Sequence, residues 1–205
     1  MAVAPSWFKY PSLKRALDVI GSLVAIPVAA PFVILISATI WLTQGRPIFF
    51  VQIRPGLESK PFKLVKFRTM SLAGPNTVMN STGQPLTSLG RLLRRLSIDE
   101  LPQLLNILRG DMSFVGPRPL LIEYLPHYTP RQSLRHKVRP GLTGLAQVSG
   151  RNSQTWDERL EKDAYYVENL SFSLDLSIFF RTIWTVISGT GVTPKGSQLM
   201  EKFRG

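Results

Sequence analysis

The residues best suited to chemistry are two adjacent carboxylates, Asp99 and Glu100. A carboxylate can act as a nucleophile, and it can also bind a hard cation. Ser97 and Glu100 have the spacing of a capping box, which predicts that a helix begins near residues 97–99. The positive end of that helix and neighbouring arginines are expected to lower the pKa of both carboxyl groups. The composition of this stretch alone favours a pair that only caps the helix.

The composition of the whole chain narrows the available chemistry. The chain has 205 residues, no Cys and two His, which excludes disulfides, thiol catalysis, iron–sulfur clusters and a polyhistidine metal site. An enzyme of this composition must use carboxylates, basic side chains, hydroxyls or a hard metal. The net charge of +12 predicts an anionic partner, which could be a phosphorylated substrate, an anionic lipid or a nucleic acid.

Arginines on both sides of the carboxylate pair could neutralise a phosphate next to it. Arginine suits bidentate contacts with phosphate, and Gly116-Pro117-Arg118-Pro119 would hold one guanidinium on a stiff turn. Each arginine could instead be a solvated surface charge or a contact with lipid headgroups. The candidates are Arg94, Arg95, Arg109, Arg118, Arg135, Arg139 and Arg151.

The segment from Val19 to Gly45 predicts a membrane helix, because its 27 residues carry no charge. It is too long for the apolar part of a cleaved signal peptide. Pro27 and Pro31 lie inside it and are expected to interrupt the helix. Basic residues precede and follow the segment, which favours a helix–break–helix that enters and leaves on one membrane face. A kinked single span is the alternative.

The remaining chain predicts a small α/β domain that is mostly helical. Residues 47–70 read as two short strands around a turn at 54–56, and residues 71–86 as a loop. Helices are expected at 88–96, 97–109 and 154–169, with Gly- and Pro-rich loops at 110–122 and 139–152. The second of these loops could include a short strand. Residues 170–188 predict an amphipathic helix, either in the membrane interface or in the core. We therefore expect a membrane segment over 1–46 and a globular domain over 47–205.

Several ordered motifs together resemble the small monotopic phosphoglycosyl transferases, also called bacterial sugar transferases. The resemblance covers roughly residues 10–204. It is carried by Lys14-Arg15 with Asp18, Ala30-Pro31, Thr43-Gln44-Gly45, Arg54-Pro55-Gly56-Leu57, Lys66-Phe67-Arg68-Thr69-Met70, Leu96-Ser97-Ile98-Asp99-Glu100-Leu101, the stretch from Gly110 to Pro119, the stretch from Arg135 to Gly141, and Gly150-Arg151-Asn152.

The resemblance implies a reaction and a place in the cell. Members of this family transfer a sugar 1-phosphate from a UDP-sugar to polyprenyl phosphate and release UMP, at the cytoplasmic face of the bacterial inner membrane. Asp99 would be the nucleophile that carries a phosphosugar, and Glu100 would help bind Mg²⁺. The family's helix breaks at Ser-Pro, which is Ala30-Pro31 here.

The resemblance also assigns basic residues to phosphate or nucleotide contacts. These residues are Lys66, Arg94, Arg118 and Arg151. Asp163 and Asp175 match acidic family positions without an assigned role. Neither the donor sugar nor an oligomeric state follows from the resemblance.

Two other functions fit part of the sequence. A non-catalytic, membrane-anchored module for anionic lipid would use the basic charge and leave Asp99 and Glu100 as a helix cap. A nucleic-acid binder would explain the charge but not the uncharged segment, so we expect no nucleic-acid partner. Release of UMP from a UDP-sugar separates the transferase from both alternatives.

Overall fold

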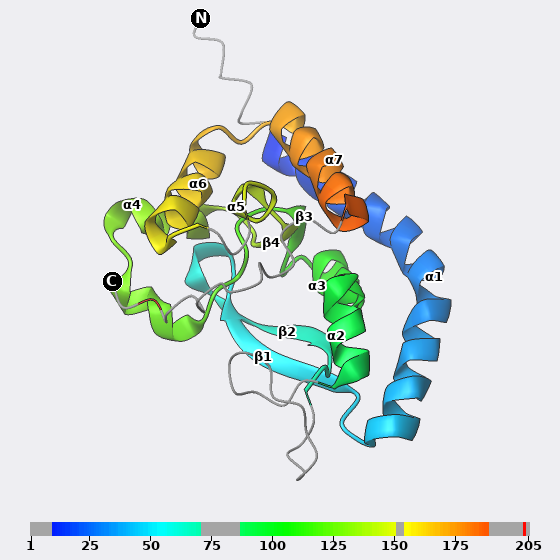
Figure 1. The fold of residues 1–205 in the computed structure, drawn as a ribbon. Helices are drawn as coiled ribbons and strands as arrows, with labels where there is room; N and C mark the ends of the chain where they lie inside the picture. The colour runs from blue at the N-terminus through cyan, green and yellow to red at the C-terminus, as the bar shows by residue number, and fades with distance from the viewer. Residues whose placement is uncertain (1–9, 71–86, 151–153, 189–202, 204–205) are drawn as a thin grey trace, which may run out of the picture.

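The computed structural model describes residues 10–70, 87–150, 154–188 and 203 (Figure 1). A long N-terminal helix runs along one side of a small domain that contains an antiparallel hairpin and several short helices. In chain order the elements are α1 (Tyr10–Gln44), β1 (Phe49–Pro55), η2 (Leu57–Ser59), β2 (Pro61–Phe67), α2 (Ser88–Arg95), η3 (Ile98–Gln103), α3 (Leu104–Arg109), β3 (Ser113–Val115), η4 (Ile122–His127), α4 (Pro130–Ser133), η5 (Leu134–Lys137), β4 (Gly141–Thr143), α5 (Leu145–Val148), α6 (Trp156–Glu168) and α7 (Phe172–Ser188).

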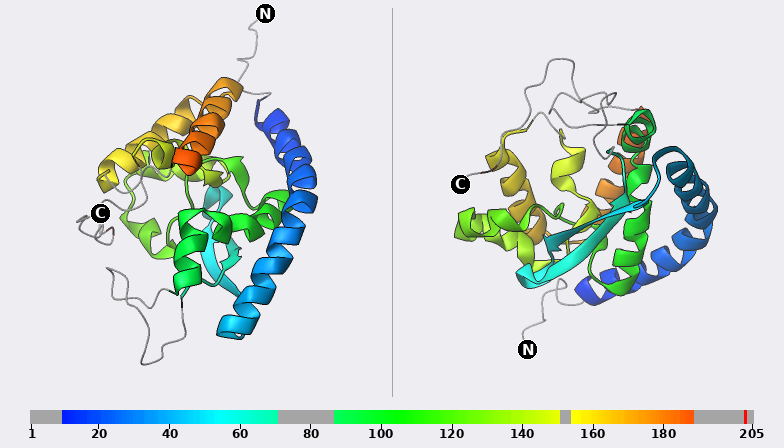
Figure 2. Two further views of the ribbon diagram at one scale, coloured as in Figure 1. Left: turned by 45° about the vertical axis from the view of Figure 1, so that its right-hand side comes forward. Right: turned by 90° about the horizontal axis from the view of Figure 1, so that it is seen from below.

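The apolar segment forms one helix, α1, with Pro27 and Pro31 inside it. We expected the helix to be interrupted at Ala30-Pro31. Instead it continues through both residues and bends along its length (Figure 2). Proline removes one backbone hydrogen bond and pushes away the preceding turn, which bends a helix without ending it. Among the described residues, α1 is the helix long and apolar enough to cross a membrane, and only 11 % of its most apolar window is buried.

The hairpin expected over residues 47–70 is confirmed, but the turn predicted at 54–56 is wrong, because β1 continues through Pro55 and the chain reverses only over residues 56–60. β1 pairs antiparallel with β2, from Phe49 opposite Phe67 to Pro55 opposite Pro61. The chain reverses through the short η2 turn, where Glu58 has a φ of 52°. The loop expected at residues 71–86 lies outside the described residues.

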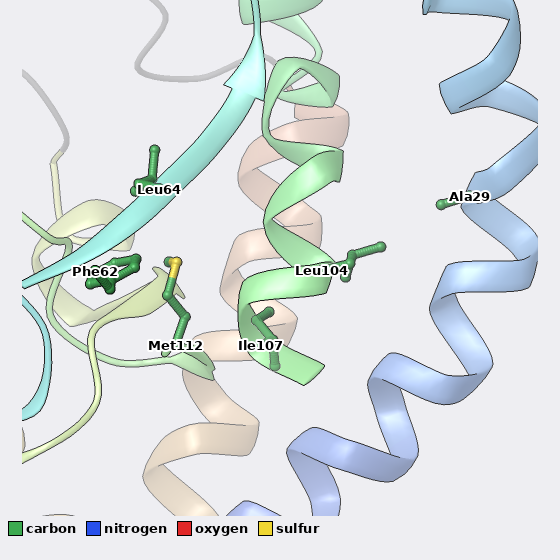
Figure 3. Packing of buried hydrophobic residues seen from close by; sticks show 6 residues of the cluster. All are labelled: Ala29, Phe62, Leu64, Leu104, Ile107 and Met112. Atoms are coloured by element: carbon green, nitrogen blue, oxygen red, sulfur yellow. The ribbon is translucent and has the colours of Figure 1, made fainter. Parts of the chain in front are cut away.

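A layer formed by α3 lies between the hairpin and α1 (Figure 3). Ile107 of α3 and Met112 are fully buried in this core, which also includes Ala29 of α1 and Phe62 of β2. A second core joins Ile40 near the end of α1 to Phe67 of β2 and Leu93 of α2. Burying apolar side chains between the three elements stabilises the docking of α1 along the domain.

Helix α2 is confirmed, but its leucine face is only partly used. Leu93 is fully buried and Leu89 packs against the same core. Leu92 and Leu96 are exposed, because the neighbouring elements cover only part of the predicted apolar stripe.

Helices α6 and α7 lie at the end of the domain away from α2 and the hairpin (Figure 1). Tyr166 of α6 and Ile178 of α7 are buried in one core with Val115 of β3. β3 pairs parallel with β4, the short strand expected within residues 139–152. The outer face of α7 exposes Phe180, Trp184, Ile187 and further apolar side chains. α7 thus joins the core along one face and leaves an apolar face uncovered.

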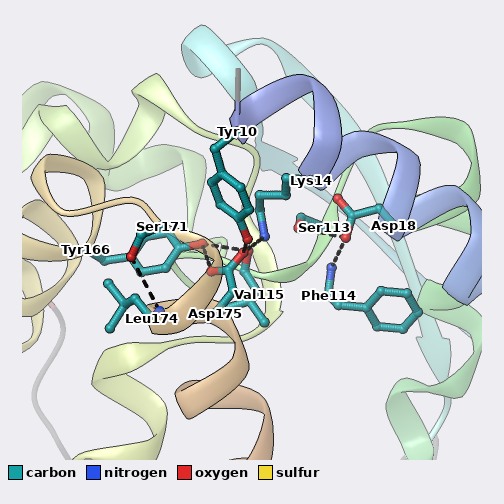
Figure 4. Close-up of polar contacts among 10 residues, drawn as sticks. All are labelled: Tyr10, Lys14, Asp18, Ser113, Phe114, Val115, Tyr166, Ser171, Leu174 and Asp175. Carbon is teal, nitrogen blue, oxygen red and sulfur yellow. Dashed lines mark hydrogen bonds and ion pairs between the residues drawn. The ribbon is translucent and has the colours of Figure 1, made fainter. Parts of the chain in front are cut away.

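Both ends of α1 are tied to the domain by polar contacts. Near its start, Asp175 of α7 accepts hydrogen bonds from Tyr10 and Lys14, each at 2.5 Å, and Tyr166 donates to the same carboxylate at 2.6 Å (Figure 4). Asp18 accepts from the Ser113 hydroxyl and the Phe114 amide, both at 3.0 Å.

At the other end of α1, Arg68 donates to the carbonyl oxygens of Gln44 and Gly45, at 2.7 and 2.8 Å. Gln44 is the last residue of α1 and Gly45 follows it, so these carbonyls lie where helix acceptors have no partner within the helix. The Arg68 guanidinium supplies that partner and holds the end of α1 against the end of β2.

Candidate active site

A cavity of about 790 Å³ contains both predicted catalytic carboxylates. Asp99 and Glu100 lie in η3, between α2 and α3. Three of the four basic residues that the resemblance assigned to phosphate contacts line the same cavity: Lys66, Arg94 and Arg118. They come from β2, α2 and the loop after β3, so the fold brings together residues that are far apart in the sequence. Arg135, from the wider set of candidate arginines, lines it as well.

The local structure around the carboxylates differs from the predicted helix start. Residues 98–103 form a 3-10 helix, and the α-helix begins only at Leu104. Ser97 has a left-handed conformation with a φ of 57° and makes no side-chain capping hydrogen bond. The predicted capping box is therefore wrong: a left-handed Ser97 lacks the extended backbone of a cap residue, and Glu100 is engaged elsewhere.

The partner of Glu100 is Arg118. One guanidinium nitrogen donates to Glu100 Oε1 at 2.5 Å, and the other lies 3.5 Å from Oε2. The Glu100 side chain is largely buried, whereas the Arg118 side chain is about half exposed. A two-point contact between a guanidinium and a carboxylate fixes the orientation of both planes, so Arg118 and Glu100 form one unit at the edge of the cavity.

Arg94 is positioned by a close approach between α2 and the chain after β2. Its Nε donates to the Thr69 hydroxyl at 2.8 Å. A Cβ on Gly90 of α2 would lie 2.0 Å from the Thr69 carbonyl oxygen, so only glycine permits this approach. The Thr87 hydroxyl caps α2 by accepting from the Gly90 amide. The sequence around Gly90 thus directs Arg94 to the cavity.

The electrostatics of Asp99 contradict the expectation of a lowered pKa. Asp99 is only 6 % exposed. Burial raises the pKa of its carboxyl group, and the neighbouring Glu100 raises it further, while Lys66, Arg94 and Arg118 act in the opposite direction. Desolvation penalises the charged form and here exceeds the attraction of three cations. Burial also lowers the pKa of Lys66, with help from Arg94 and Arg118.

Helices α6 and α7 also line the cavity, which the sequence did not predict. α6 contributes Trp156, Arg159 and Asp163, whose spacing of three and four residues places them on one helix face. α7 contributes four residues, among them Phe179 and Thr182. The spacing along α6 was a detectable signal, but only the tertiary structure shows that this face points to the cavity.

Other predicted residues lie outside this group. Arg151 is not among the described residues. Ala30 and Pro31 lie in α1 and do not line the cavity. Within the described ranges, no cluster of three or more His, Cys, Asp or Glu residues could hold a metal ion by itself. A cation at Asp99 and Glu100 would therefore need other ligands as well.

A buried carboxylate surrounded by cations suits an anionic substrate, and here it belongs to a domain docked on an apolar helix. These features fit a membrane-associated protein that acts on an anionic substrate, and comparison with known proteins agrees. The model of the family described as "Bacterial sugar transferase" matches residues 9–189. This chain belongs to the bacterial sugar transferase family.

Individual relatives cover nearly the whole chain. It is 45 % identical over 199 residues to the "Uncharacterized sugar transferase EpsL" of Bacillus subtilis, covering 94 % of this chain and 96 % of that protein. It is 40 % identical to the UDP-glucose:undecaprenyl-phosphate glucose-1-phosphate transferase of Caulobacter vibrioides, covering 85 % of this chain and 70 % of that protein.

A longer relative matches through part of its length. The UDP-N-acetylgalactosamine-undecaprenyl-phosphate N-acetylgalactosaminephosphotransferase of Aeromonas hydrophila is 35 % identical, and the match covers 89 % of this chain but 45 % of that protein. The names of this relative and of the Caulobacter vibrioides relative specify different donor sugars, N-acetylgalactosamine and glucose.

Proposed function

We propose that this chain transfers a sugar 1-phosphate from a UDP-sugar to polyprenyl phosphate, through a covalent phosphosugar on Asp99. The observation that carries this proposal is the buried Asp99 carboxylate in a cavity lined by Lys66, Arg94 and Arg118. The named relatives that act on UDP-glucose or UDP-N-acetylgalactosamine and undecaprenyl phosphate support the general reaction. The products are polyprenyl diphosphate-linked sugar and UMP, which would begin the assembly of a bacterial glycoconjugate.

In the first half-reaction, an oxygen of Asp99 attacks the phosphorus atom that bears the sugar. The bond from that phosphorus to the bridging oxygen breaks, and UMP leaves with the bridging oxygen. Phosphoryl transfer depends mainly on placement and on neutralising charge. Lys66, Arg94 and Arg118 supply that neutralisation. Exclusion of water from the site strengthens the attraction between these cations and the phosphate, and it leaves the nucleophilic oxygen of Asp99 less solvated.

In the second half-reaction, a phosphate oxygen of the lipid acceptor attacks the same phosphorus, and the Asp99 carboxylate leaves. Both substrates therefore use one site in turn. The cavity wall suits this order because it is charged near η3, whereas along α7 Phe179 and Val186 add apolar surface beside Thr182 and Thr185. An apolar wall is compatible with the first isoprene unit of the acceptor.

The cavity also fits a bound Mg²⁺. Mg²⁺ commonly takes one or two carboxylates and completes its shell with substrate phosphate oxygens and water. Glu100 would hold the ion with Asp99 beside it, because the Arg118 contact leaves lone pairs on the Glu100 oxygens. When bound, Mg²⁺ would neutralise negative charge on the donor diphosphate.

We further propose that α1 is re-entrant and that the domain lies on the cytoplasmic face of the bacterial inner membrane. Both ends of α1 contact the same domain, through Asp175 near Tyr10 and through Arg68 near Gln44. A helix that crossed the membrane would separate its ends by a hydrocarbon layer of about 30 Å. Contacts at both ends favour a bent helix that dips into one leaflet, and the apolar outer face of α7 would lie in the interface.

The decisive experiment is mass spectrometry of the detergent-purified protein after incubation with Mg²⁺ and a panel of UDP-sugars, without acceptor. We expect a phosphosugar adduct on the peptide that contains Asp99, together with release of UMP. Asp99→Asn should show neither, because an amide is a poor nucleophile. Asp157→Asn, at an exposed position in the first turn of α6, is the matched control and should behave as wild type.

Each alternative gives a different result. Normal turnover by Asp99→Asn would refute the covalent mechanism. Release of UMP only when polyprenyl phosphate is present would indicate direct transfer. A wild-type protein that releases no UMP with donors and lipid together would favour the non-catalytic, lipid-binding module.

A further inference from the structure

The backbone of Pro117, Arg118 and Pro119 is held through three successive carbonyl oxygens. Prolines at positions 117 and 119 have no backbone N–H, so only acceptors remain on these residues. The carbonyl oxygen of Pro117 accepts from the Gly141 amide at 3.0 Å. The next carbonyl, of Arg118, accepts from Arg135 at 2.5 Å. The third, of Pro119, accepts from Arg54 at 3.4 Å.

Arg135 is the buried centre of this support. Its side chain is only 2 % exposed. Besides the Arg118 carbonyl, its guanidinium contacts the Tyr128 hydroxyl at 3.1 Å and the Asp163 carboxylate at 3.0 Å. The same nitrogen of Arg135, Nη2, reaches both Asp163 and the Arg118 carbonyl. The position of Arg135 therefore links α6 directly to the backbone of the Arg118 loop.

Asp163 supplies the negative charge that makes this arrangement possible. Its side chain is 6 % exposed, and a buried guanidinium without a counter-ion is strongly unfavourable. Burial raises the pKa of Asp163 to about 6, although Arg135 and Arg159 favour its ionised form. Asp163 is the carboxylate that the structure places in contact with Arg135, so its loss would leave this buried guanidinium without its counter-ion.

We propose that Asp163 is a positioning residue: through Arg135 it fixes the backbone of Arg118 and so places the Arg118 guanidinium at Glu100 and at the diphosphate of the nucleotide donor. The chain of contacts runs from Asp163 to Arg135, from Arg135 to the Arg118 carbonyl, and from the Arg118 guanidinium to Glu100. The diphosphate in this statement rests on the proposed function, whereas the chain of contacts does not.

Asp163 and Arg135 also border the cavity, so the test must separate positioning from direct contact with the ligand. A double-mutant cycle does so, with the affinity for UDP as the readout. Asp163→Asn should weaken UDP binding about tenfold in the wild-type background, within the usual coupling range for groups in one network. In the Arg118→Ala background the same change should cost less than about twofold, because the group that it positions is gone.

The matched control is Glu161→Gln, on the exposed face of the same helix, where Glu161 pairs with Arg131. This change removes a carboxylate of α6 that has no contact with the Arg118 loop, and it should leave UDP affinity unchanged in both backgrounds. Where Asp163→Asn does not fold, as judged by circular dichroism, the cycle is run with Tyr128→Phe. That change removes only the hydroxyl that contacts Arg135 and should weaken binding about threefold in the wild-type background alone.

An equal loss of affinity in both backgrounds would overturn the proposal, since it would mean that Asp163 contacts the ligand itself or acts on the whole fold. Absence of measurable UDP binding by the wild-type protein would overturn it too. Failure of the proposed function looks different: UDP would bind and the cycle would be non-additive, but no UDP-sugar would yield UMP.

Discussion

The contact between α1 and α7 gives the sharpest test of how the apolar helix is held. Asp175 accepts three hydrogen bonds, from Tyr10, Lys14 and Tyr166. The Lys14 and Asp175 side chains are only 11 % and 10 % exposed. Replacing Asp175 by Asn would keep the shape of the side chain but leave the Lys14 ammonium buried without a counter-ion.

The expected loss of stability follows from that unpaired charge. Removing one partner of a buried ion pair typically costs about 3–5 kcal/mol, which is a large part of the total stability of a small protein. For a chain of this size each kcal/mol lowers the melting temperature by about 2–4 °C. We therefore expect Asp175→Asn to melt roughly 6–20 °C below wild type.

A second variant isolates the charge. In Lys14→Met with Asp175→Asn, neither charge is present and the Asn oxygen still accepts from a tyrosine hydroxyl, so most of the lost stability should return. Thermal unfolding of the detergent-purified proteins, followed by circular dichroism, measures both. A single variant that melts within about 2 °C of wild type, or a double variant less stable than the single one, would refute the reasoning.

Four further outcomes follow from the same structure. Because the pKa of Asp99 is raised, the rate of UMP release should fall as the pH is lowered, with an apparent pKa above the ordinary Asp value of 3.8. The raised pKa also means that ionised Asp99 destabilises the fold, so Asp99→Asn should melt at or above the wild-type temperature at pH 7. This gain should vanish below pH 3.8, where the carboxyl group is protonated in both the folded and the unfolded state. If Asp99 only capped a helix, the substitution would instead lower the free energy of unfolding by about 0.5–2 kcal/mol. Gly90→Ala should destabilise the fold by about 1–3 kcal/mol and reduce UMP release, because its Cβ would meet the Thr69 carbonyl. The control Ser88→Ala, at an exposed position of α2, should change neither the unfolding temperature nor the rate of UMP release. Chelation of divalent cations should abolish UMP release and added Mg²⁺ should restore it, and full activity in a chelator would contradict the assignment of Glu100 to a metal.

Where the sequence pattern failed, a neighbour distant in sequence was responsible. Ser97 and Glu100 have the spacing of a capping box, but Glu100 pairs with Arg118 of a distant loop and Ser97 takes a left-handed conformation. The sign of the Asp99 shift was mispredicted for a similar reason. Nearby arginines are visible in the sequence, whereas the burial that outweighs them depends on the whole fold.

Other features were predictable because they depend on local pattern. The hairpin over residues 47–70 follows from two short strand-like runs around a Pro-Gly turn signal, and it is confirmed although its turn lies later than predicted. Helix α6 follows from a polar, helix-prone stretch and is confirmed. The uncharged stretch after Asp18 forms a single long helix, as its apolar composition requires. Its prolines indicated a disturbance, but whether they end the helix or bend it depends on packing against α3 and β2.

The sequence by itself determined the family, the apolar helix and the residue types available for chemistry, because these are encoded in ordered motifs and composition. Only the tertiary structure decided which cations meet Asp99, since Lys66, Arg94 and Arg118 come from three separate elements. The same holds for Asp163, whose partner Arg135 lies in another element. Contacts between segments remote in sequence arise from packing, and no local pattern specifies them.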